Sequence, residues 1–339
     1  MTSSLSVALA RLKQGTDLTP DESSSAFAEV MVGAASQEQI AALLLGLREK
    51  GETAAEVAGA VRALREVMVR VEAGEGSPPV DTCGTGGGAV STLNISTGAA
   101  FVAAAAGTRV AKHGNRSYTS RCGSADLLEA LGVSITLGAE AAGRTLQSAG
   151  MAFLFAPNFH PAMRHVAPVR RELKVATIMN LVGPLANPAS VRRQVVGIAE
   201  AARAQLVAEA LVELGTDHAM VVHGEIGMDE ISPAGRTSVL EIRGNTVRRW
   251  MLDPVDHRLE WGRPEDLAGG EPAENADRIE RLLEGRGREG DRRAVLLNAA
   301  AAIYVSGLVE TYEAAVIAAT EALESGRALG VLGALRGAG

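Results

Sequence analysis

The sequence predicts an α/β fold in which a small N-terminal helical domain precedes a larger domain with a mainly parallel sheet flanked by helices. Helix-capping signals repeat through the first 70 residues of the 339-residue chain. Beyond them, short apolar runs alternate with helical windows, which is typical of β-α units. We expect the helical domain at 1–72, joined by a helical insert near 160–190, and the α/β domain at 78–339.

The N-terminal helices are predicted from a hydroxyl residue followed three positions later by Glu or Gln, the spacing of a capping box. The pairs are Thr19 with Glu22, Ser36 with Gln39, and Thr53 with Glu56. The leucine-rich segment 39–51 should bury one face and end at Gly51. The segment 72–81 is rich in Gly, Ser and Pro and reads as a linker.

The elements of the α/β domain follow from the same alternation of apolar runs and helical windows. Strands are expected up to Asp81 and at 109–113, 133–138, 151–157, 194–199 and 218–224, with a hairpin at 237–252 that turns at Gly244-Asn245. Helices are expected at 98–107, 124–132, 139–150, 161–173, 201–215, 291–307 and 311–326.

Bulk composition limits the function classes. The formal net charge of −7 argues against a general nucleic-acid binder. Neither a signal peptide nor a membrane-spanning stretch is apparent, so a cytoplasmic location is expected. Aromatic residues make up only 3%, so Ala, Leu and Val must build the core. The two cysteines, Cys83 and Cys122, are expected to be reduced thiols.

The stretch "CGTGGGAVSTLNIST" at 83–97 is the first candidate for chemistry. Gly84, Gly86 and Ala89 fit a dinucleotide fingerprint, but the residues that follow are poor helix openers and the region about 20 positions on is basic rather than acidic. A P-loop would end in Gly-Lys-Ser/Thr, which is missing. The stretch is therefore either a connecting turn or a phosphate cradle of another design.

Hydroxyl and amide side chains follow the glycines, just before an apolar helix. Asn94, Ser96 and Thr97 could serve an anion site at the helix N-terminus, or Ser96 and Thr97 could simply cap the helix.

A second loop of similar character follows the next expected strand. It reads "KHGNRSYTSRCGSAD" over 112–126 and is dense in cationic and hydroxyl donors, which suit a phosphate or pyrophosphate. A solvated polar loop, with Ser124 as a helix cap, is the alternative. The phosphate interpretation gains weight because two such loops follow consecutive strands.

Two further segments carry titratable groups. Asp229 and Glu230 follow the strand at 218–224, and adjacent carboxylates suit magnesium, although they are also common on any solvated loop. Beside two phosphate-suited loops, magnesium becomes the natural bridge to a pyrophosphate. The window 160–171 holds His160, Arg164, His165, Arg170 and Arg171, of which at most one or two need be functional.

Taken together, these motifs resemble the anthranilate phosphoribosyltransferase family, which performs the second step of the tryptophan branch. The resemblance rests on "GTGGGAVSTLNIST", "KHGNRSYTSRCGSADLLEALG", "HPAMRHVAPVRRELKVATIMNLVGPLANP" and "VVHGEIGMDEIS". It covers nearly the whole chain, and four motifs in the same order are far more specific than any one of them.

The resemblance implies a set of site residues. Phosphoribosyl pyrophosphate would bind Gly84, Gly87, Gly88, Thr92, Asn94, Ile95, Ser96, Thr97, Lys112, His113, Gly114, Asn115, Arg116, Ser117, Tyr118, Thr119, Ser120 and Ser124. Anthranilate would contact Gly84, His113, Asn115, His160, Arg170 and Pro184. Ser96, Asp229 and Glu230 would hold magnesium, with two ions expected per subunit, and Lys112, Asn115 and Arg170 would be catalytic.

The resemblance also implies a homodimer joined through the N-terminal helices and a magnesium-dependent transfer of the phosphoribosyl group to the amine of anthranilate. An aryl amine is already nucleophilic, so no covalent intermediate is required, and no compelling general base is apparent. Orientation and stabilisation of the leaving pyrophosphate would supply the rate.

Three positions depart from the family pattern. Gly88 stands where the family usually has aspartate, and Lys174 and Ala176 replace its usual glycine and arginine. We expect Gly88 to alter substrate or metal affinity rather than abolish activity.

Two other functions compete with this interpretation. A pyrimidine nucleoside phosphorylase shares the fold class, but "KHGNR" and "PVRREL" with "NLVGPLANP" favour the phosphoribosyltransferase. A catalytically silent relative that binds nucleic acid would need a basic surface and damaged metal ligands, whereas Asp229 and Glu230 are retained.

Overall fold

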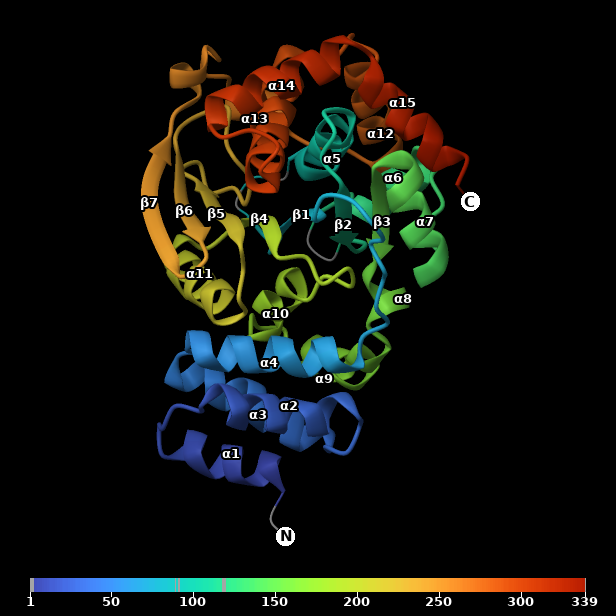
Figure 1. Cartoon of the computed structure of the whole chain (residues 1–339). Coiled ribbons are helices and arrows are strands. Elements are labelled where there is room, and N and C mark those ends of the chain that lie inside the picture. The colour runs from blue at the N-terminus through green and yellow to red at the C-terminus, as the bar shows by residue number, and fades with distance from the viewer. Residues whose placement is uncertain (1–2, 89, 91, 118–119, 339) are drawn as a thin grey trace.

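The helical bundle at one end of the molecule comes from the first four helices. The structure, a computed structural model, describes residues 3–88, 90, 92–117 and 120–338. Helices α1 to α4 lie together below the α/β part, the short helix α10 lies between the two, and α9 lies beside the bundle (Figure 1). The bundle helices are α1 (Ser4–Lys13), α2 (Pro20–Met31), α3 (Gln37–Lys50) and α4 (Ala54–Val67). The capping boxes predicted at Thr19, Ser36 and Thr53 are all confirmed.

The α/β part is built on one sheet of seven strands in the order β3-β2-β1-β4-β5-β6-β7. Strands β1 to β5 run parallel, and β6 and β7 are antiparallel additions at one edge. The strands are β1 (Val80–Gly84), β2 (Val110–Gly114), β3 (Met151–Phe155), β4 (Arg193–Gly197), β5 (His218–Gly224), β6 (Thr237–Arg243) and β7 (Thr246–Leu252). The chain proceeds from β1 toward β3 and later from β4 toward β7, so the strand order reverses between β1 and β4.

Helices cover both faces of this sheet. They are α5 (Ile95–Ala105), α6 (Ser124–Ala130), α7 (Ala139–Ala149), α8 (Ala156–Phe159), α9 (Ala167–Leu173), α10 (Met179–Leu185), α11 (Ala204–Glu213), α12 (Pro272–Leu283), α13 (Glu289–Ser306), α14 (Tyr312–Glu324) and α15 (Arg327–Arg336). Short 3-10 turns lie at Pro161–His165, Ala201–Arg203, Pro254–His257 and Pro264–Leu267. None of the helices within the described ranges is long and apolar enough to cross a membrane.

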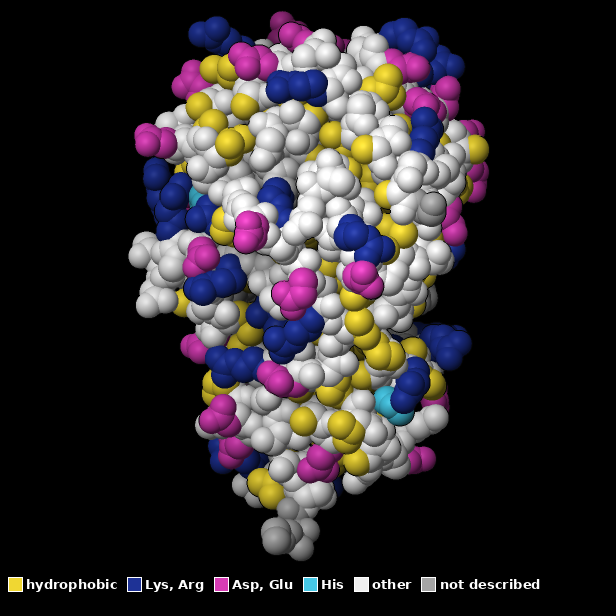
Figure 2. All heavy atoms as spheres, turned by 45° about the vertical axis from the view of Figure 1, so that its right-hand side comes forward, with side chains coloured by type: hydrophobic (Ala, Val, Ile, Leu, Met, Phe, Trp, Pro, Cys, Tyr) yellow, Lys and Arg dark blue, Asp and Glu magenta, His cyan; other side chains and the backbone are white. Residues whose placement is uncertain are grey.

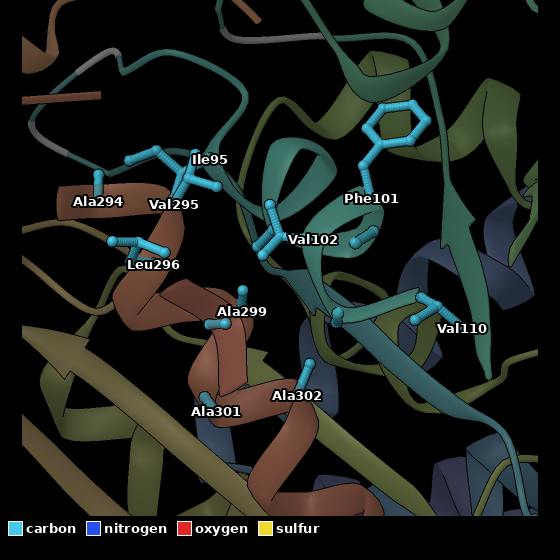
Figure 3. Packing of buried hydrophobic residues seen from close by; sticks show 14 of the residues in the cluster. Ile95, Phe101, Val102, Val110, Ala294, Val295, Leu296, Ala299, Ala301 and Ala302 are labelled. Atoms are coloured by element: carbon cyan, nitrogen blue, oxygen red, sulfur yellow. The ribbon is translucent and has the colours of Figure 1, made fainter. Parts of the chain in front are cut away.

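Small residues build the core on one face of the sheet. Helices α5 and α13 pack side by side there, with Phe101 and Val102 on α5 and a run of alanines on α13 (Figure 3). A Cβ at Gly98 would lie 2.9 Å from side-chain atoms of Ile279 and Val295, so the glycine allows α5 to approach α12 and α13 closely. The alanine-rich composition thus yields tight helix contacts in place of aromatic filling.

The opposite face shares its core with the helical bundle. One cluster of buried side chains runs from α1 to α4 through α10 and α11 to strands β4, β5 and β6. The helices near 160–190 are part of this cluster, with α10 packed against α4 and α9 against α3. The bundle is therefore packed onto the sheet through α10 and α11.

The structure corrects four of the expected elements. Residues 133–138 form no strand, although Val133 and Ile135 are buried as an alternating pattern predicts. Strand β1 runs to Gly84 rather than ending near Asp81, and α5 begins at Ile95 rather than Gly98. The helical window 161–173 is divided at Val166. Helix α9 begins one residue before Pro168, which lacks the N–H needed to continue the hydrogen bonds of the preceding turn.

Candidate active site

The loops that leave β1, β2, β4 and β5 meet at the carboxyl edge of the sheet, next to the point where the strand order reverses. Ligands of open parallel sheets bind at this place, because neighbouring loops diverge there and leave a crevice. The two phosphate-suited loops and the carboxylate loop predicted from the sequence are three of these four loops.

Asp229 and Glu230 contact the glycine loop and the start of α5 directly. The Gly86 N–H donates to Asp229 Oδ2 at 2.7 Å, and the Ser96 N–H donates to Glu230 Oε1 at 3.1 Å. Segments more than 130 residues apart in sequence are thus joined at one point. Capping of α5 by Ser96 or Thr97 is not what the structure shows, because both lie inside its first turn and Asn94 is the N-cap.

Two glycines make room for the Asp229 loop. A Cβ at Gly84 would lie 2.5 Å from Asp229 Oδ2, and a Cβ at Gly197 would lie 1.6 Å from the Asp229 backbone oxygen. Both distances are below van der Waals contact, so any side chain at these positions would displace the carboxylate.

Lys112 is the cation at the floor of the site. It is buried, and its Nζ donates to the Thr82 carbonyl at 2.5 Å and lies 3.2 Å from Ser96 Oγ. Burial lowers the pKa of Lys112, and the charges of Asp81 and Glu230 oppose that effect. The ammonium group is thereby fixed beside the N-terminus of α5, where a phosphate would be favoured by charge and by helix dipole.

Two carboxyl groups flank this lysine, the buried Asp81 and the half-buried Glu230. Burial, reinforced by the charge of Asp229, raises the pKa of Glu230 to about 8, against the opposing effects of Lys112 and Ser96. Burial likewise raises the pKa of Asp81 to about 6, although Asp81 Oδ1 accepts the His113 N–H at 3.0 Å. Asp81 Oδ2 has no hydrogen-bond partner within the described part of the chain.

The donor set at this edge fits a hard divalent cation. Ser96, Asp229 and Glu230 supply oxygen atoms only, and no described residues form a group of three or more His, Cys, Asp or Glu able to enclose a metal. Magnesium in phosphate sites is held in this open way, by one or two carboxylates together with the substrate phosphates and water.

The loop after β2 is fastened by helix α6. Arg116 forms an ion pair with Asp126 at 2.8 Å and a second with Glu129. Both partners lie on α6, so the guanidinium group of Arg116 is paired with that helix. Ser124 Oγ donates to the Asn115 carbonyl at 3.2 Å, while Gly123, not Ser124, is the N-cap of α6. Ser117 and Ser120 are joined through their hydroxyl oxygens at 2.7 Å, and Tyr118 and Thr119 lie outside the described residues.

The segment before α5 is fixed by contacts that the sequence did not reveal. Asn94 donates to the Cys122 carbonyl at 3.0 Å and accepts from Asn275 on α12 at 3.0 Å. Thr92 forms a β-bridge with Ala268, in the connection that leads to α12. Helix α12 therefore orients both phosphate-suited loops, and nothing in its own residues marks it for this role.

Two neutral imidazoles line the side of the site that faces α10. The ring centroids of His113 and His160 are 5.0 Å apart. Burial lowers the pKa of His113 to about 3, with further lowering by His160 and Lys112, and burial lowers the pKa of His160 to about 4. The backbone of Gly183 on α10 faces the His113 ring and Pro184 follows it in the chain, while Arg170 lies half-buried on α9.

A recess of about 170 Å³ opens between the glycine loop and α10. Its walls include Gly86 and Gly87 on one side, Ala176 and Asn180 on another, and the loop after β4 up to Arg203. This last loop has no sequence motif that predicts a site, although the strand before it ends at the same edge as β1 and β5.

Comparison with known proteins now identifies the family. The helical part, residues 6–68, matches the helical bundle domain of a glycosyl transferase family, and residues 76–329 match the α/β domain of the same family. An anthranilate phosphoribosyltransferase of Rubrobacter xylanophilus is 49% identical over 325 residues, which cover 96% of this chain and 94% of that protein. The chain belongs to the anthranilate phosphoribosyltransferase family.

Relatives and solved structures agree with this assignment over the full length. The anthranilate phosphoribosyltransferase of Methanosarcina acetivorans is 45% identical, over 94% of this chain and 85% of its own. The crystal structure of the family member from Thermus thermophilus superposes with a TM-score of 0.92 at 41% identity, covering 98% of both chains. The Saccharomyces cerevisiae enzyme, solved in complex with PRPP and Mg, gives a TM-score of 0.90 at 26% identity, covering 98% and 97%.

The departures from the family pattern fall at the mouth of the site. A Cβ at Gly88 would lie 3.0 Å from the Gly227 carbonyl oxygen, so an aspartate there needs a small shift of the neighbouring loop. Lys174 adopts a left-handed conformation with φ of 52° at the end of α9, a position that favours the glycine usual in the family. Ala176 lines the recess and presents only a methyl group to it.

Proposed function

We propose that this protein transfers the phosphoribosyl group of phosphoribosyl pyrophosphate to the amine of anthranilate, giving N-(5-phosphoribosyl)anthranilate and pyrophosphate in tryptophan biosynthesis. The observation that carries the proposal is the meeting of the glycine loop, Lys112 and the Asp229–Glu230 pair at one edge of the sheet. These are the groups that a magnesium-bound pyrophosphate requires.

The donor substrate is held by backbone and side-chain donors. The N–H groups of the glycine loop and of the first turn of α5 bind its phosphate oxygens, together with Lys112. The hydroxyl groups of Ser96, Ser117 and Ser120 add neutral donors around the same oxygens. In the protein without substrate, Asp229 and Glu230 occupy some of these N–H groups, so binding exchanges a carboxylate for a phosphate.

Magnesium is bound through Ser96, Asp229 and Glu230, with two ions per subunit. The ion neutralises charge on the departing pyrophosphate. Asp229 supplies negative charge for the metal, and Glu230, whose pKa burial raises to about 8, would lose its proton when the metal binds.

The acceptor is bound on the side of His113, His160 and Pro184, and Arg170 and Asn115 bind its carboxylate and amine. The amine lone pair attacks C1 of the ribose, the bond from C1 to the pyrophosphate oxygen breaks, and the amine loses one proton. Neutral imidazoles suit this pocket because a protonated histidine would compete with Arg170 for the carboxylate. Lys112 stabilises the negative charge that develops on the leaving group.

The subunits associate as a homodimer through the N-terminal bundle. Val7 on α1 and Val32, the C-cap residue of α2, are exposed there at 44% and 66%. Light scattering should give twice the chain mass, and Val7→Glu with Val32→Glu should shift it toward the monomer. A monomeric wild-type protein would refute this part of the proposal.

The test of the reaction is the loss of anthranilate fluorescence when phosphoribosyl pyrophosphate and magnesium are added to the purified protein. We expect a loss that a chelator abolishes, with pyrophosphate released in equal amount. A folded protein that shows no loss over a wide range of magnesium concentration would refute the proposed function.

A further inference from the structure

The last turn of α10 is held from three directions. The Pro184 carbonyl accepts from Gln194 Nε2 on β4 at 3.2 Å and from Cys83 Sγ on β1 at 3.5 Å. The next carbonyl, that of Leu185, accepts from Arg65 on α4 of the helical bundle. Residues of the sheet and of the bundle thus hydrogen-bond to adjacent carbonyl groups of one short helix. That helix contributes Pro184 to the acceptor-side wall, the part of the site formed by His113, His160 and Pro184.

Arg65 makes its contact with both arms of the guanidinium group. Its Nη2 lies 2.7 Å and its Nε 3.2 Å from the Leu185 oxygen, so two N–H groups converge on one acceptor. Leu185 is the last residue of α10, where unpaired carbonyls and the negative end of the helix dipole attract a cation. The contact therefore fixes the end of α10 in distance and direction.

Burying a guanidinium charge next to other arginines costs free energy, so this is an unfavourable donor for a carbonyl group. Arg65 is half-buried, and burial together with the like charges of Arg62 and Arg70 lowers its pKa to about 10. A neutral side chain would avoid both penalties. The paired N–H groups of Arg65 fix the end of α10 more firmly than one neutral donor would, and a use for that position lies in what the helix borders.

That use is indicated by what lies on the other side of the turn. The backbone of Gly183 faces the His113 ring, and His113 lies against His160. A shift of the α10 end would therefore move Pro184 relative to the two imidazoles. The donor-side groups, Lys112 with Ser96, are held by β1 and α5 instead and have no contact of this kind with Arg65.

Resting on the function proposed above, we propose that Arg65 is a positioning residue that sets the acceptor-side wall of the site from within the helical bundle. It touches neither substrate. It acts through the Leu185 carbonyl on Pro184, and so it should govern affinity for the aromatic acceptor rather than for the phosphorylated donor.

The chain provides a matched control one turn earlier on the same helix. Arg62 Nη2 donates to the Glu213 carbonyl at 2.9 Å, and Glu213 is the last residue of α11. Arg62 and Arg65 thus make the same kind of bond from α4 to the end of a helix, but only α10 borders the site.

The experiment compares Arg65→Met, Arg65→Lys and Arg62→Met in the full-length protein, with KM measured separately for anthranilate and phosphoribosyl pyrophosphate and with thermal melting measured alongside. We expect Arg65→Met to raise KM for anthranilate about tenfold, as loss of a charged hydrogen bond allows, and to change KM for the donor less than about twofold. Arg65→Lys should restore part of the affinity, since it keeps the charge and one donor. Arg62→Met should lower the melting temperature with both KM values kept within about twofold.

Equal rises in both KM values, or the same KM change in Arg62→Met, would overturn the proposal and leave Arg65 a structural residue. If Arg65→Met does not fold, the comparison of Arg65→Lys with Arg62→Met decides in the same way. A wild-type protein without transfer activity would refute the proposed function itself, whereas an active wild type with an unchanged Arg65→Met would refute only this inference.

Discussion

A single methyl group at Gly84 tests whether the carboxylate loop must approach the glycine loop. In Gly84→Ala the new Cβ would start 2.5 Å from Asp229 Oδ2, so the carboxylate must move away. We expect kcat/KM to fall about 100-fold and the magnesium concentration for half activity to rise, because a displaced ligand weakens both metal and leaving-group binding. Steady-state kinetics over a magnesium titration checks this.

The control for that substitution is Gly138→Ala, since a Cβ at Gly138 meets no atom within 4 Å and its φ is −76°. It should leave the kinetics unchanged. Normal magnesium dependence in Gly84→Ala would mean that Asp229 is not a metal ligand.

Gly88 is the position where restoring the family residue is informative. Gly88→Asp adds a carboxylate at the mouth of the site, with its Cβ 3.0 Å from the Gly227 oxygen. We expect the dependence of rate on magnesium concentration to change. The added carboxylate is a further oxygen ligand close to the proposed metal site, and the loop must shift by a few tenths of an ångström to admit it. Kinetics identical to the wild type at all metal concentrations would show that this position is neutral.

Buried histidines make the protein sensitive to mild acid. The pKa of His160 falls from 6.5 in the unfolded chain to about 4 in the fold, so between these pH values the unfolded chain binds a proton that the fold excludes. Stability is therefore lost as pH falls from 6.5 toward 4, by up to about 1.4 kcal/mol per pH unit for each such histidine.

Denaturant unfolding of His160→Asn at a series of pH values measures this contribution. The variant should show a shallower loss of unfolding free energy between pH 6.5 and 4 than the wild type. His165→Asn, in the same segment but half-exposed, should keep the wild-type slope. Equal slopes in His160→Asn and wild type would contradict the burial of a neutral imidazole.

At the scale of elements, the capping boxes share one sequence pattern but differ in their energetic weight. Glu56 of the third box is fully buried, accepts from the Leu18 N–H at 2.9 Å, and pairs with Lys50 at 3.1 Å. Glu22 of the first box is partly exposed and pairs only weakly with Arg11. We expect Glu56→Ala to cost about 3 kcal/mol of unfolding free energy and Glu22→Ala about 1 kcal/mol or less.

Chemical denaturation of the two variants makes the comparison at one pH. Equal losses would mean that the contact from α4 to the loop before α2 contributes nothing beyond the cap itself.

Most elements could be predicted because their residues agree with their local structure. The hairpin at Gly244-Asn245 and the helix at 139–150 are examples, since turn chemistry and periodicity suffice for both. Residues 133–138 fail for a physical reason. Val133 and Ile135 have the burial pattern of a strand, but a strand also needs a neighbour for its backbone, and no local signal reveals whether one is present.

The same limit applies to the site. Lys112, Asp229 and Glu230 could be proposed because charged residues in loops after strands have few other reasons to cluster. Asn275 and Arg65 could not, because each acts through a backbone or amide contact whose partner is more than 100 residues away. The pKa values of Asp81 and His160 likewise depend on burial that only the assembled fold creates.

At the scale of the whole molecule, the two ends of the parallel strands differ in role: the candidate site lies at their carboxyl ends, and a structural cluster lies at their amino ends. The amino edge of β5 holds a polar cluster around Glu241, whose Oε1 accepts from Arg243 Nε and Tyr304 Oη, both at 2.9 Å, and lies 3.1 Å from His218 Nε2. Burial alone would raise the pKa of Glu241, but these hydrogen bonds lower it to about 2. No proposed site residue belongs to this cluster.

Glu241→Gln should therefore affect stability without affecting turnover. We expect a loss of about 2 kcal/mol at neutral pH, with KM and kcat unchanged. Because the folded pKa is depressed, the wild-type advantage should disappear as pH falls from 4.5 toward 2. Glu280→Gln, which breaks a surface pair with Arg336, should change stability by less than about 1 kcal/mol, and altered kinetics in Glu241→Gln would show that the two ends of the strands are coupled.

The surface is mixed in charge on the face shown in Figure 2, where basic and acidic side chains are interspersed over both the bundle and the α/β part. A protein that binds nucleic acid would gather its basic residues into a stripe or patch. On this face the charge pattern gives no support to such a role.

The core that runs from the bundle to the sheet has a consequence for how the molecule comes apart. Leu43 and Leu64 of the bundle, Val182 of α10 and Val221 of β5 belong to one continuous cluster of buried side chains. Unfolding the bundle alone would expose α10 and one face of the sheet to water. Such partial unfolding would lose the hydrophobic burial of the bundle and of the sheet at the same time. The bundle and the catalytic part are distinct as architecture, but they form a single cooperative unit, and the acceptor wall loses its order with either of them.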